Sequence, residues 1–125
     1  MAILAKSLNT RVDFHTRANS MNGGIGSKHG DILIGDRAFE FYNYRNPEDF
    51  IQIPWTEIER VRAQVYFKDK FIRGFFIDTY QNGSFNFIVK EAGKSLKAMS
   101  AYLAPEKLVK HKPVLSLKNL WKKEQ

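Results

Sequence analysis

Apolar and polar side chains alternate with a period of two through most of this chain, and the alternation limits the fold to one built mainly from β-strands. In a strand, successive side chains point to opposite faces, so every second residue can enter a core. The clearest run is 60–67, whose apolar members share one face: Val61, Ala63, Val65 and Phe67. Similar runs predict about seven strands, at residues 12–18, 32–34, 38–42, 50–53, 60–67, 71–80 and 85–89.

Glycine, asparagine and proline mark the turns between these runs. Gly35-Asp36 and Asn82-Gly83 predict hairpin turns, because these residue types tolerate the positive φ that tight turns require. Residues 22–30 contain four glycines and predict a flexible loop. Pro54 ends the strand over 50–53, since proline lacks the N–H that a strand ladder needs.

The period changes to about three and a half after Glu91, which predicts a single helix. Leu96, Met99 and Leu103 fall on one stripe of that helix, and Pro105 ends it. An antiparallel sheet of this length bends into two packed layers or a partial barrel, whose open end a helix can close. The predicted fold is therefore α+β and mostly β: an antiparallel sandwich or partial barrel of about seven strands capped by a C-terminal helix.

The charge is concentrated near the C-terminus. The net charge is +7, yet residues 1–89 hold 11 Lys and Arg against 10 Asp and Glu, whereas residues 90–125 hold 9 Lys and 3 Glu. A nearly neutral body with a basic appendage disfavours a nucleic-acid-binding core. There is no cysteine, and the apolar stretch at residues 2–5 is too short for a signal peptide. We expect a cytoplasmic protein.

Three stretches carry a resemblance: GDILIG at residues 30–35, FEF at 39–41 and IQIPWTEI at 51–58. They are similar to bacterial pleckstrin-homology-like and GRAM-type domains, in which two strands precede an I-P-W-x-x-I step and a C-terminal helix closes the domain. That helix corresponds here to Glu91–Ala104. The resemblance implies a pleckstrin-homology-like domain over residues 10–104.

The whole chain, with its lysine-rich end, resembles a small family of uncharacterised proteins encoded beside mannose-family sugar phosphotransferase permeases in Gram-positive bacteria. This resemblance implies an accessory or regulatory role in that transport system, with a permease component as partner. It implies no catalytic residue.

No motif predicts catalysis, a metal site or a cofactor. The sequence GGIGSK at 23–28 has the wrong order for a phosphate-binding loop, although Lys28 and His29 leave a weak anion site as an alternative. The three histidines have no metal-ligand spacing: His15, His29 and His111. Carboxylate pairs at 48–49 and 57–59 are expected at the surface, without a pocket to raise a pKa. We therefore predict a protein that is not an enzyme.

Surplus aromatic residues predict a binding surface. The run 71–80 is apolar on both sides, with Phe71 and Phe75 on one face and Ile72 on the other. Either the N-terminal segment or the tail covers the second face, or a partner does. The candidate partner-binding residues of the domain are Tyr42, Tyr44, Tyr66, Arg73 and Phe76.

Residues 105–125 predict a basic amphipathic tail. Its apolar members lie within one arc of a helical wheel, and three of them are candidate partner-binding residues: Leu117, Leu120 and Trp121. Three lysines outside the arc are candidate contacts to a membrane or an anion: Lys118, Lys122 and Lys123. The tail can pack on the domain, dock in a groove of a partner, or rest on an anionic membrane.

The leading prediction is therefore a module that binds another protein. The alternative is a peripheral membrane or anionic-lipid-binding module that uses the basic tail. Nucleic acid is disfavoured as a partner, and a homo-oligomer stays open.

Overall fold

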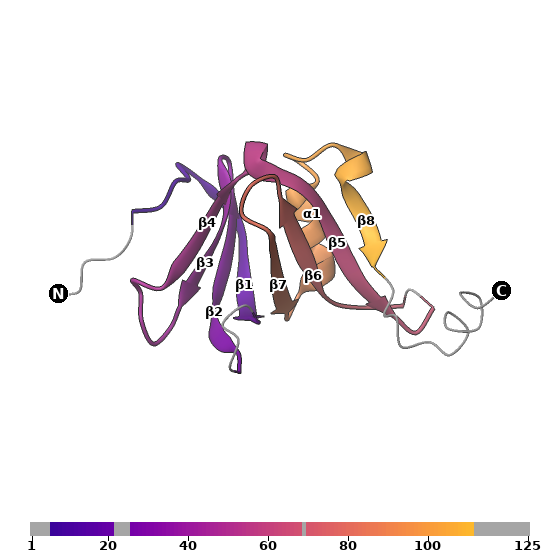
Figure 1. Ribbon diagram of the computed structural model, residues 1–125, viewed down its shortest axis with the longest axis horizontal. Coiled ribbons are helices and arrows are strands. Elements are labelled where there is room, and N and C mark those ends of the chain that lie inside the picture. Colours follow the sequence, from indigo (N-terminus) through magenta and orange to yellow (C-terminus); the bar gives the residue numbers. More distant parts are fainter. Residues whose placement is uncertain (1–5, 22–25, 69, 112–125) are drawn as a thin grey trace.

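The computed structural model describes residues 6–21, 26–68 and 70–111, which form one eight-stranded sheet and one α-helix (Figure 1). The strands are β1 (Val12–Ser20), β2 (Lys28–Gly35), β3 (Ala38–Asn43), β4 (Phe50–Pro54), β5 (Ile58–Tyr66), β6 (Phe71–Thr79), β7 (Ser84–Val89) and β8 (Leu108–His111). The helix α1 (Ala92–Met99) follows β7, and two short 3-10 turns, η1 (Trp55–Glu57) and η2 (Pro105–Lys107), precede β5 and β8. The prediction of a mostly β fold with one helix is confirmed.

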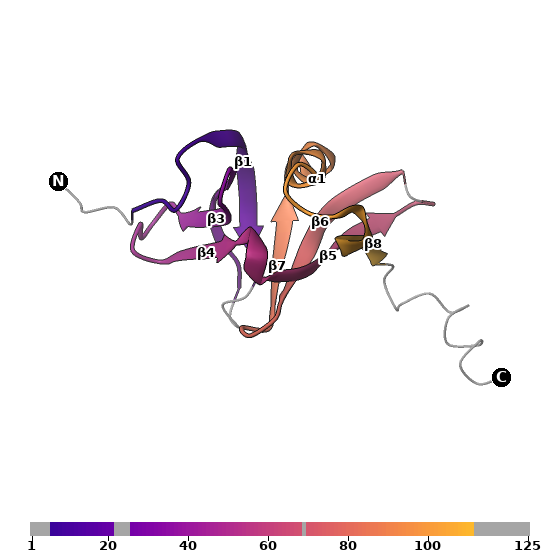
Figure 2. The same cartoon turned by 90° about the horizontal axis from the view of Figure 1, so that it is seen from above.

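The strands lie in the order β4-β3-β2-β1-β7-β6-β5-β8. All neighbours are antiparallel except β8, which runs parallel to β5. Figure 1 shows that β3 and β4 incline in the opposite sense to β5 and β6, and Figure 2 shows α1 in the opening between the two halves. The sheet therefore folds around one core, and α1 covers its open side.

The eighth strand was not predicted. Residues 105–111 of the expected tail form η2 and β8, so the sheet extends beyond the domain boundary expected at residue 104. A four-residue strand is too short to produce a clear alternation, and its parallel pairing with β5 joins segments distant in the sequence. The helix is also shorter than expected, because α1 ends at Met99.

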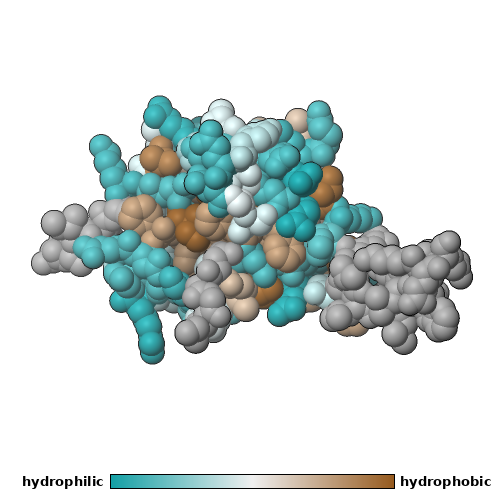
Figure 3. All heavy atoms as spheres, viewed as in Figure 1, coloured by the Kyte–Doolittle hydropathy of each residue, from teal (hydrophilic) through white to brown (hydrophobic). Residues whose placement is uncertain are grey.

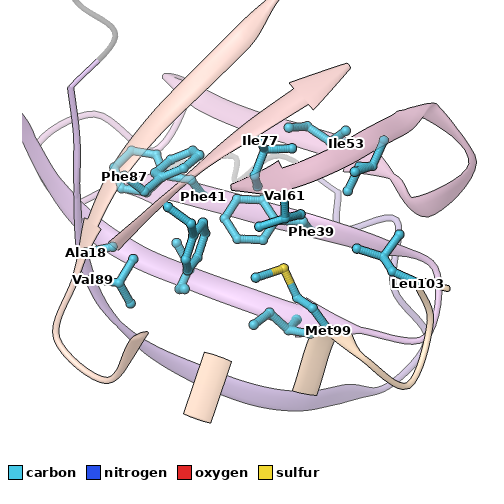
Figure 4. Packing of buried hydrophobic residues seen from close by; sticks show 14 of the residues in the cluster. Ala18, Phe39, Phe41, Ile53, Val61, Ile77, Phe87, Val89, Met99 and Leu103 are labelled. Atoms are coloured by element: carbon cyan, nitrogen blue, oxygen red, sulfur yellow. The ribbon is translucent and has the colours of Figure 1, made fainter. Parts of the chain in front are cut away.

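The core is built around four phenylalanines in contact: Phe39, Phe41, Phe75 and Phe87. The centroids of the Phe39 and Phe87 rings are 5.0 Å apart. Met99 and Leu103 close this cluster from the helical side, as the helical stripe predicted (Figure 4).

A bulge in β6 changes which of its apolar residues share a face. The pairing of β6 with β5 shifts by one residue at Arg73, which has no partner in β5. The alternation reverses there, so Phe75 and Ile72 both pack on the core, whereas Phe71 is 49% exposed. Uninterrupted alternation placed Phe71 and Phe75 on one face, and that prediction is wrong.

Gly35, at the turn between β2 and β3, lies where there is no room for a side chain. Gly35 does not have the positive φ that the sequence suggested. Instead, a Cβ at this position would lie 2.3 Å from the carbonyl oxygen of Arg11. The prediction for Asn82-Gly83 holds, since Gly83 has a φ of 74° in the loop between β6 and β7.

Residues 6–10, which we call the N-terminal strap, cover β3 on the side opposite the core. The fully buried Glu40 accepts hydrogen bonds there from Ser7 Oγ at 2.6 Å, Leu8 N at 2.7 Å and Asn9 Nδ2 at 3.1 Å. A buried carboxylate is costly unless its oxygens are paired, and the strap supplies those partners. The strap therefore belongs to the folded domain.

Candidate functional site

The sheet presents one face away from the core, which we call the outer face. Cross-strand partners on β2, β1, β7, β6 and β5 form one continuous row across the sheet: His29, Asn19, Ile88, Gly74 and Gln64. Figure 3 shows apolar side chains reaching the surface among hydrophilic ones. Among the described residues, the most exposed large hydrophobic side chain is Phe67, at the hairpin between β5 and β6.

Three aromatic side chains at this hairpin contact one another, and we call them the aromatic cluster: Tyr66, Phe67 and Phe71. Their ring centroids are 6.3 to 6.5 Å apart. Phe67 is 76% exposed, so the prediction that it faces the core with Val61 and Val65 is wrong. Exposed phenylalanines in contact form an apolar surface that water solvates poorly.

The turn itself places Phe67 at the tip. Phe67 and Lys68 have φ values of 53° and 56°, and Lys70 N donates to the carbonyl oxygen of Phe67 at 3.2 Å. Two successive residues at positive φ fit the right-handed twist of a hairpin, yet a bulky residue rarely adopts this conformation. Glycine or asparagine would form the same turn at less cost. The chain thus keeps an exposed phenylalanine where the backbone disfavours it.

A basic hollow adjoins the cluster on the outer face. It has a volume of about 310 Å³, and the residues that line it include Arg17, Asn19, Phe71, Arg73, Ile88 and Lys90. Phe71 therefore belongs to both features. Of the predicted contact residues, Tyr66 and Arg73 lie in this region, whereas the importance of Phe67, Phe71, Arg17 and Lys90 was not predicted. The signal for the cluster was FKDKF at residues 67–71, with a phenylalanine on each side of the turn.

Tyr42 and Tyr44 lie elsewhere, in and just after β3, which is separated from β6 by β2, β1 and β7. The Tyr42 hydroxyl accepts a hydrogen bond from Gln52 Nε2 at 3.1 Å, and burial raises the pKa of Tyr42. The exposed Tyr44 donates to Asp31 at 2.6 Å, which raises the pKa of Tyr44. These two tyrosines therefore form a second group, apart from Tyr66.

Phe76 packs within the chain. The guanidinium of Arg62 lies 4.5 Å from the Phe76 ring centroid, and the His111 ring lies 5.0 Å away in an edge arrangement. Arg62 is held in turn by Asp78, at 2.8 and 2.9 Å. Burial acts to raise the pKa of Asp78, but hydrogen bonds from Arg62 and other donors outweigh it and lower the pKa to about 2. Phe76 is therefore covered on the outer face.

The predicted tail residues lie outside the described residues: Leu117, Leu120, Trp121, Lys118, Lys122 and Lys123. Residues 22–25 of the glycine loop predicted at 22–30 also lie outside them, and the prediction is wrong for residues 28–30, which belong to β2. Lys28, considered for a weak anion site, pairs with Asp49 at 2.7 Å. His29 contacts Asn19 Oδ1 at 2.7 Å.

Within residues 6–21, 26–68 and 70–111, no group of three His, Asp or Glu side chains is arranged to hold a metal ion. In the same part of the chain, no helix is long and apolar enough to cross a membrane.

The family described as "Domain of unknown function (DUF956)" matches residues 4–120. No curated protein matches the sequence. The crystal structure of the C-terminal domain of an unknown protein from Leishmania infantum has a similar fold, with a TM-score of 0.63 and 13% identity over 74% of this chain and 83% of that chain. At this identity the likeness concerns the fold alone.

Proposed function

The chain belongs to the DUF956 family, and from this premise we propose that it is a non-enzymatic module that binds another protein through the aromatic cluster. The observation that carries the proposal is the exposure of Phe67 and Phe71, at 76% and 49%, in contact with each other. Interface cores are enriched in aromatic residues, and burying one such side chain contributes about 1.5–3 kcal/mol.

The finer fold assignment is part of the proposal. Seven antiparallel strands followed by one helix that covers the open side support a pleckstrin-homology-like or GRAM-type domain. Folds of one type carry many functions, so the fold does not identify the ligand.

The partner we propose is a component of a mannose-family sugar phosphotransferase system, with this chain as its accessory or regulatory protein in the cytoplasm. This choice comes from the resemblance of the whole sequence to proteins encoded beside such permeases. The aromatic cluster offers an apolar anchor for a docking partner, and Lys68 and Lys70 flank it as a polar rim.

A pull-down from cells that contain the permease tests the proposal. We expect the full chain to retain a permease subunit. The double variant Phe67→Ala/Phe71→Ala should retain at least about tenfold less of that subunit, since it lacks two side chains that the partner would bury. Phe50→Ala is the matched control, because Phe50 is 39% exposed on the edge strand β4. Failure of the unaltered chain to retain any permease subunit would contradict the proposal, as would equal losses in both variants.

The second candidate is peripheral binding to an anionic membrane. It is favoured by a specific observation, the position of Phe67 at the tip of a hairpin with exposed Lys68 and Lys70 beside it. An aromatic ring can enter the interfacial region while nearby lysines contribute about 1 kcal/mol each to anionic lipids.

Co-sedimentation with phosphatidylglycerol vesicles tests this candidate. Binding should weaken as salt rises, because salt screens exposed charges. Two variants of the full chain show which part binds the vesicles. A loss of binding in Phe67→Ala assigns it to the hairpin, and a loss in the triple variant Lys118→Gln/Lys122→Gln/Lys123→Gln assigns it to the tail. No co-sedimentation at low salt would eliminate membrane binding.

A further inference from the structure

We propose that the basic hollow on the outer face binds a phosphate monoester. This inference goes beyond the protein-binding proposal, because it concerns a small anion held by cations of the hollow. The two proposals share Phe71, so Arg73 and Lys90 carry the test that separates them.

The hollow exists because β7 ends before its neighbours do. The last pair of β7 with β1 is Val89 with Ala18, and the last with β6 is Ile88 with Gly74. Both neighbours continue past these pairs, so Arg17 on β1 and Arg73 on β6 flank the gap, and Lys90 lies at its end. Lys90 N donates to the carbonyl oxygen of Arg17 at 3.0 Å, which holds these two residues together.

The bulge in β6 is what brings Arg73 to the gap. Arg73 is the extra residue in the pairing of β6 with β5, and its side chain is exposed. Bulges re-aim side chains at the positions where they occur. The same bulge turns Phe71 to this face, so one irregularity supplies both a cation and an aromatic wall.

The charge of the hollow is positive. Three cationic side chains line it, and among the described residues Arg73 and Lys90 form no ion pair. Two carboxylates lie next to these cations: Asp31 is paired with Arg17 across β1 and β2, and Glu91 follows Lys90 in the chain. Each also has other partners. Asp31 accepts from Tyr44 at 2.6 Å, and Glu91 accepts from Thr16 at 3.1 Å and pairs with Lys94 at 3.2 Å.

The donors suit a phosphate group. Arginine forks bind phosphate oxygens in pairs, and lysine adds a point charge. The carbonyl oxygen of the Asn19 side chain is engaged by His29, which leaves its amino group as a further donor. Phosphate binding by these groups needs no helix terminus.

The size and the apolar wall indicate an ester rather than a free anion. A volume of about 310 Å³ lies at the lower end of small-molecule sites and leaves room for a small organic group. Phe71 and Ile88 provide an apolar wall for that group. A phosphate monoester combines a compact anion with such a group.

Amide NMR spectra of the full chain at low ionic strength provide the test, with phenyl phosphate, inorganic phosphate and sodium chloride of equal ionic strength as the three titrants. We expect phenyl phosphate to shift the amides of Arg17, Asn19 and Ile88 and to bind several-fold more tightly than inorganic phosphate. Chloride should leave these amides unchanged.

Variants assign the binding to the hollow. Arg73→Gln and Lys90→Gln should each weaken phenyl phosphate binding by about tenfold or more, because each removes a charge-assisted hydrogen bond. Arg37→Gln is the control, since Arg37 is exposed in the turn between β2 and β3. All three positions are exposed, so each variant should fold. Phe71→Ala should remove the advantage of phenyl phosphate over inorganic phosphate.

Three results would overturn the inference: shifts that chloride reproduces, equal affinity in Arg73→Gln and Arg37→Gln, or no response to either soluble phosphate. Phosphatidylglycerol vesicles form a fourth arm. Vesicle binding without a response to soluble phosphate would assign these charges to a membrane surface and not to the hollow.

Discussion

Replacement of Asp78 by asparagine measures how much the ion pairs on the outer face stabilise this fold. The Asp78 side chain is 7% exposed and lies 2.7 Å from Arg60 Nε and 2.8 Å from Arg62 Nε. Removing its charge leaves Arg62 without its carboxylate partner above the Phe76 ring. We expect Asp78→Asn to lower the free energy of unfolding at pH 7.

The magnitude follows from the lowered pKa. The pKa of Asp78 falls from 3.8 to about 2 in the folded state, and a shift of this size corresponds to about 2–3 kcal/mol. Because the folded pKa is depressed, this stabilisation is complete above the unfolded pKa and is lost as pH falls through the folded pKa. About half of it should therefore remain at pH 3.

Urea denaturation followed by circular dichroism at pH 7 and pH 3 gives the required differences in unfolding free energy. Comparing Asp78→Asn with the unaltered chain at each pH cancels the titration of the other carboxylates. Glu48→Gln, in an exposed loop, controls for the loss of one negative charge. The reasoning is refuted if the difference between Asp78→Asn and the unaltered chain is the same at both pH values.

Three further substitutions test the backbone and the strap, with urea denaturation as the common assay. Asn9→Ala removes the acceptor of hydrogen bonds from Arg37 N and Ala38 N and the donor of a hydrogen bond to Glu40, and should destabilise the fold by about 2–3 kcal/mol. A change below about 0.5 kcal/mol would show that the strap is not part of the domain. Gly74→Ala should lower the free energy of unfolding by about 2 kcal/mol or more, because its Cβ would lie 2.0 Å from the Phe87 carbonyl oxygen. Gly93→Ala in α1 is the matched control: its Cβ meets no atom within 4 Å, and it should raise the free energy of unfolding by about 0.5–1 kcal/mol. Equal effects of the two substitutions would contradict this account. Phe67→Asn should raise stability by up to about 1 kcal/mol through relief of positive φ while it reduces partner retention, and a loss of stability would show that Phe67 supports the fold.

The last of these substitutions bears on why the cluster exists. A sequence under selection for stability alone would place asparagine or glycine in this turn. Retention of a phenylalanine that is 76% exposed at positive φ is the kind of local cost that functional sites carry.

Local patterns in the sequence determined the elements up to the helix. Two-residue alternation located β1 to β7, and the stripe of Leu96, Met99 and Leu103 located α1. These patterns are readable because burial of one face imposes a period on each element separately. Asn82-Gly83 was readable for a similar reason, since the requirement for positive φ acts on single residues.

Only the tertiary structure decided the register and the surface. The bulge at Arg73 reverses the alternation of β6. The amino-acid sequence of β6 alone does not reveal this bulge, because a bulge depends on how two strands pair. The parallel pairing of β8 with β5 and the burial of Glu40 by the strap likewise join segments far apart in the chain. The aromatic cluster and the basic hollow arise from these pairings. Alternation assigns a side chain to one of the two faces of its strand, but the neighbouring elements determine whether that face is covered.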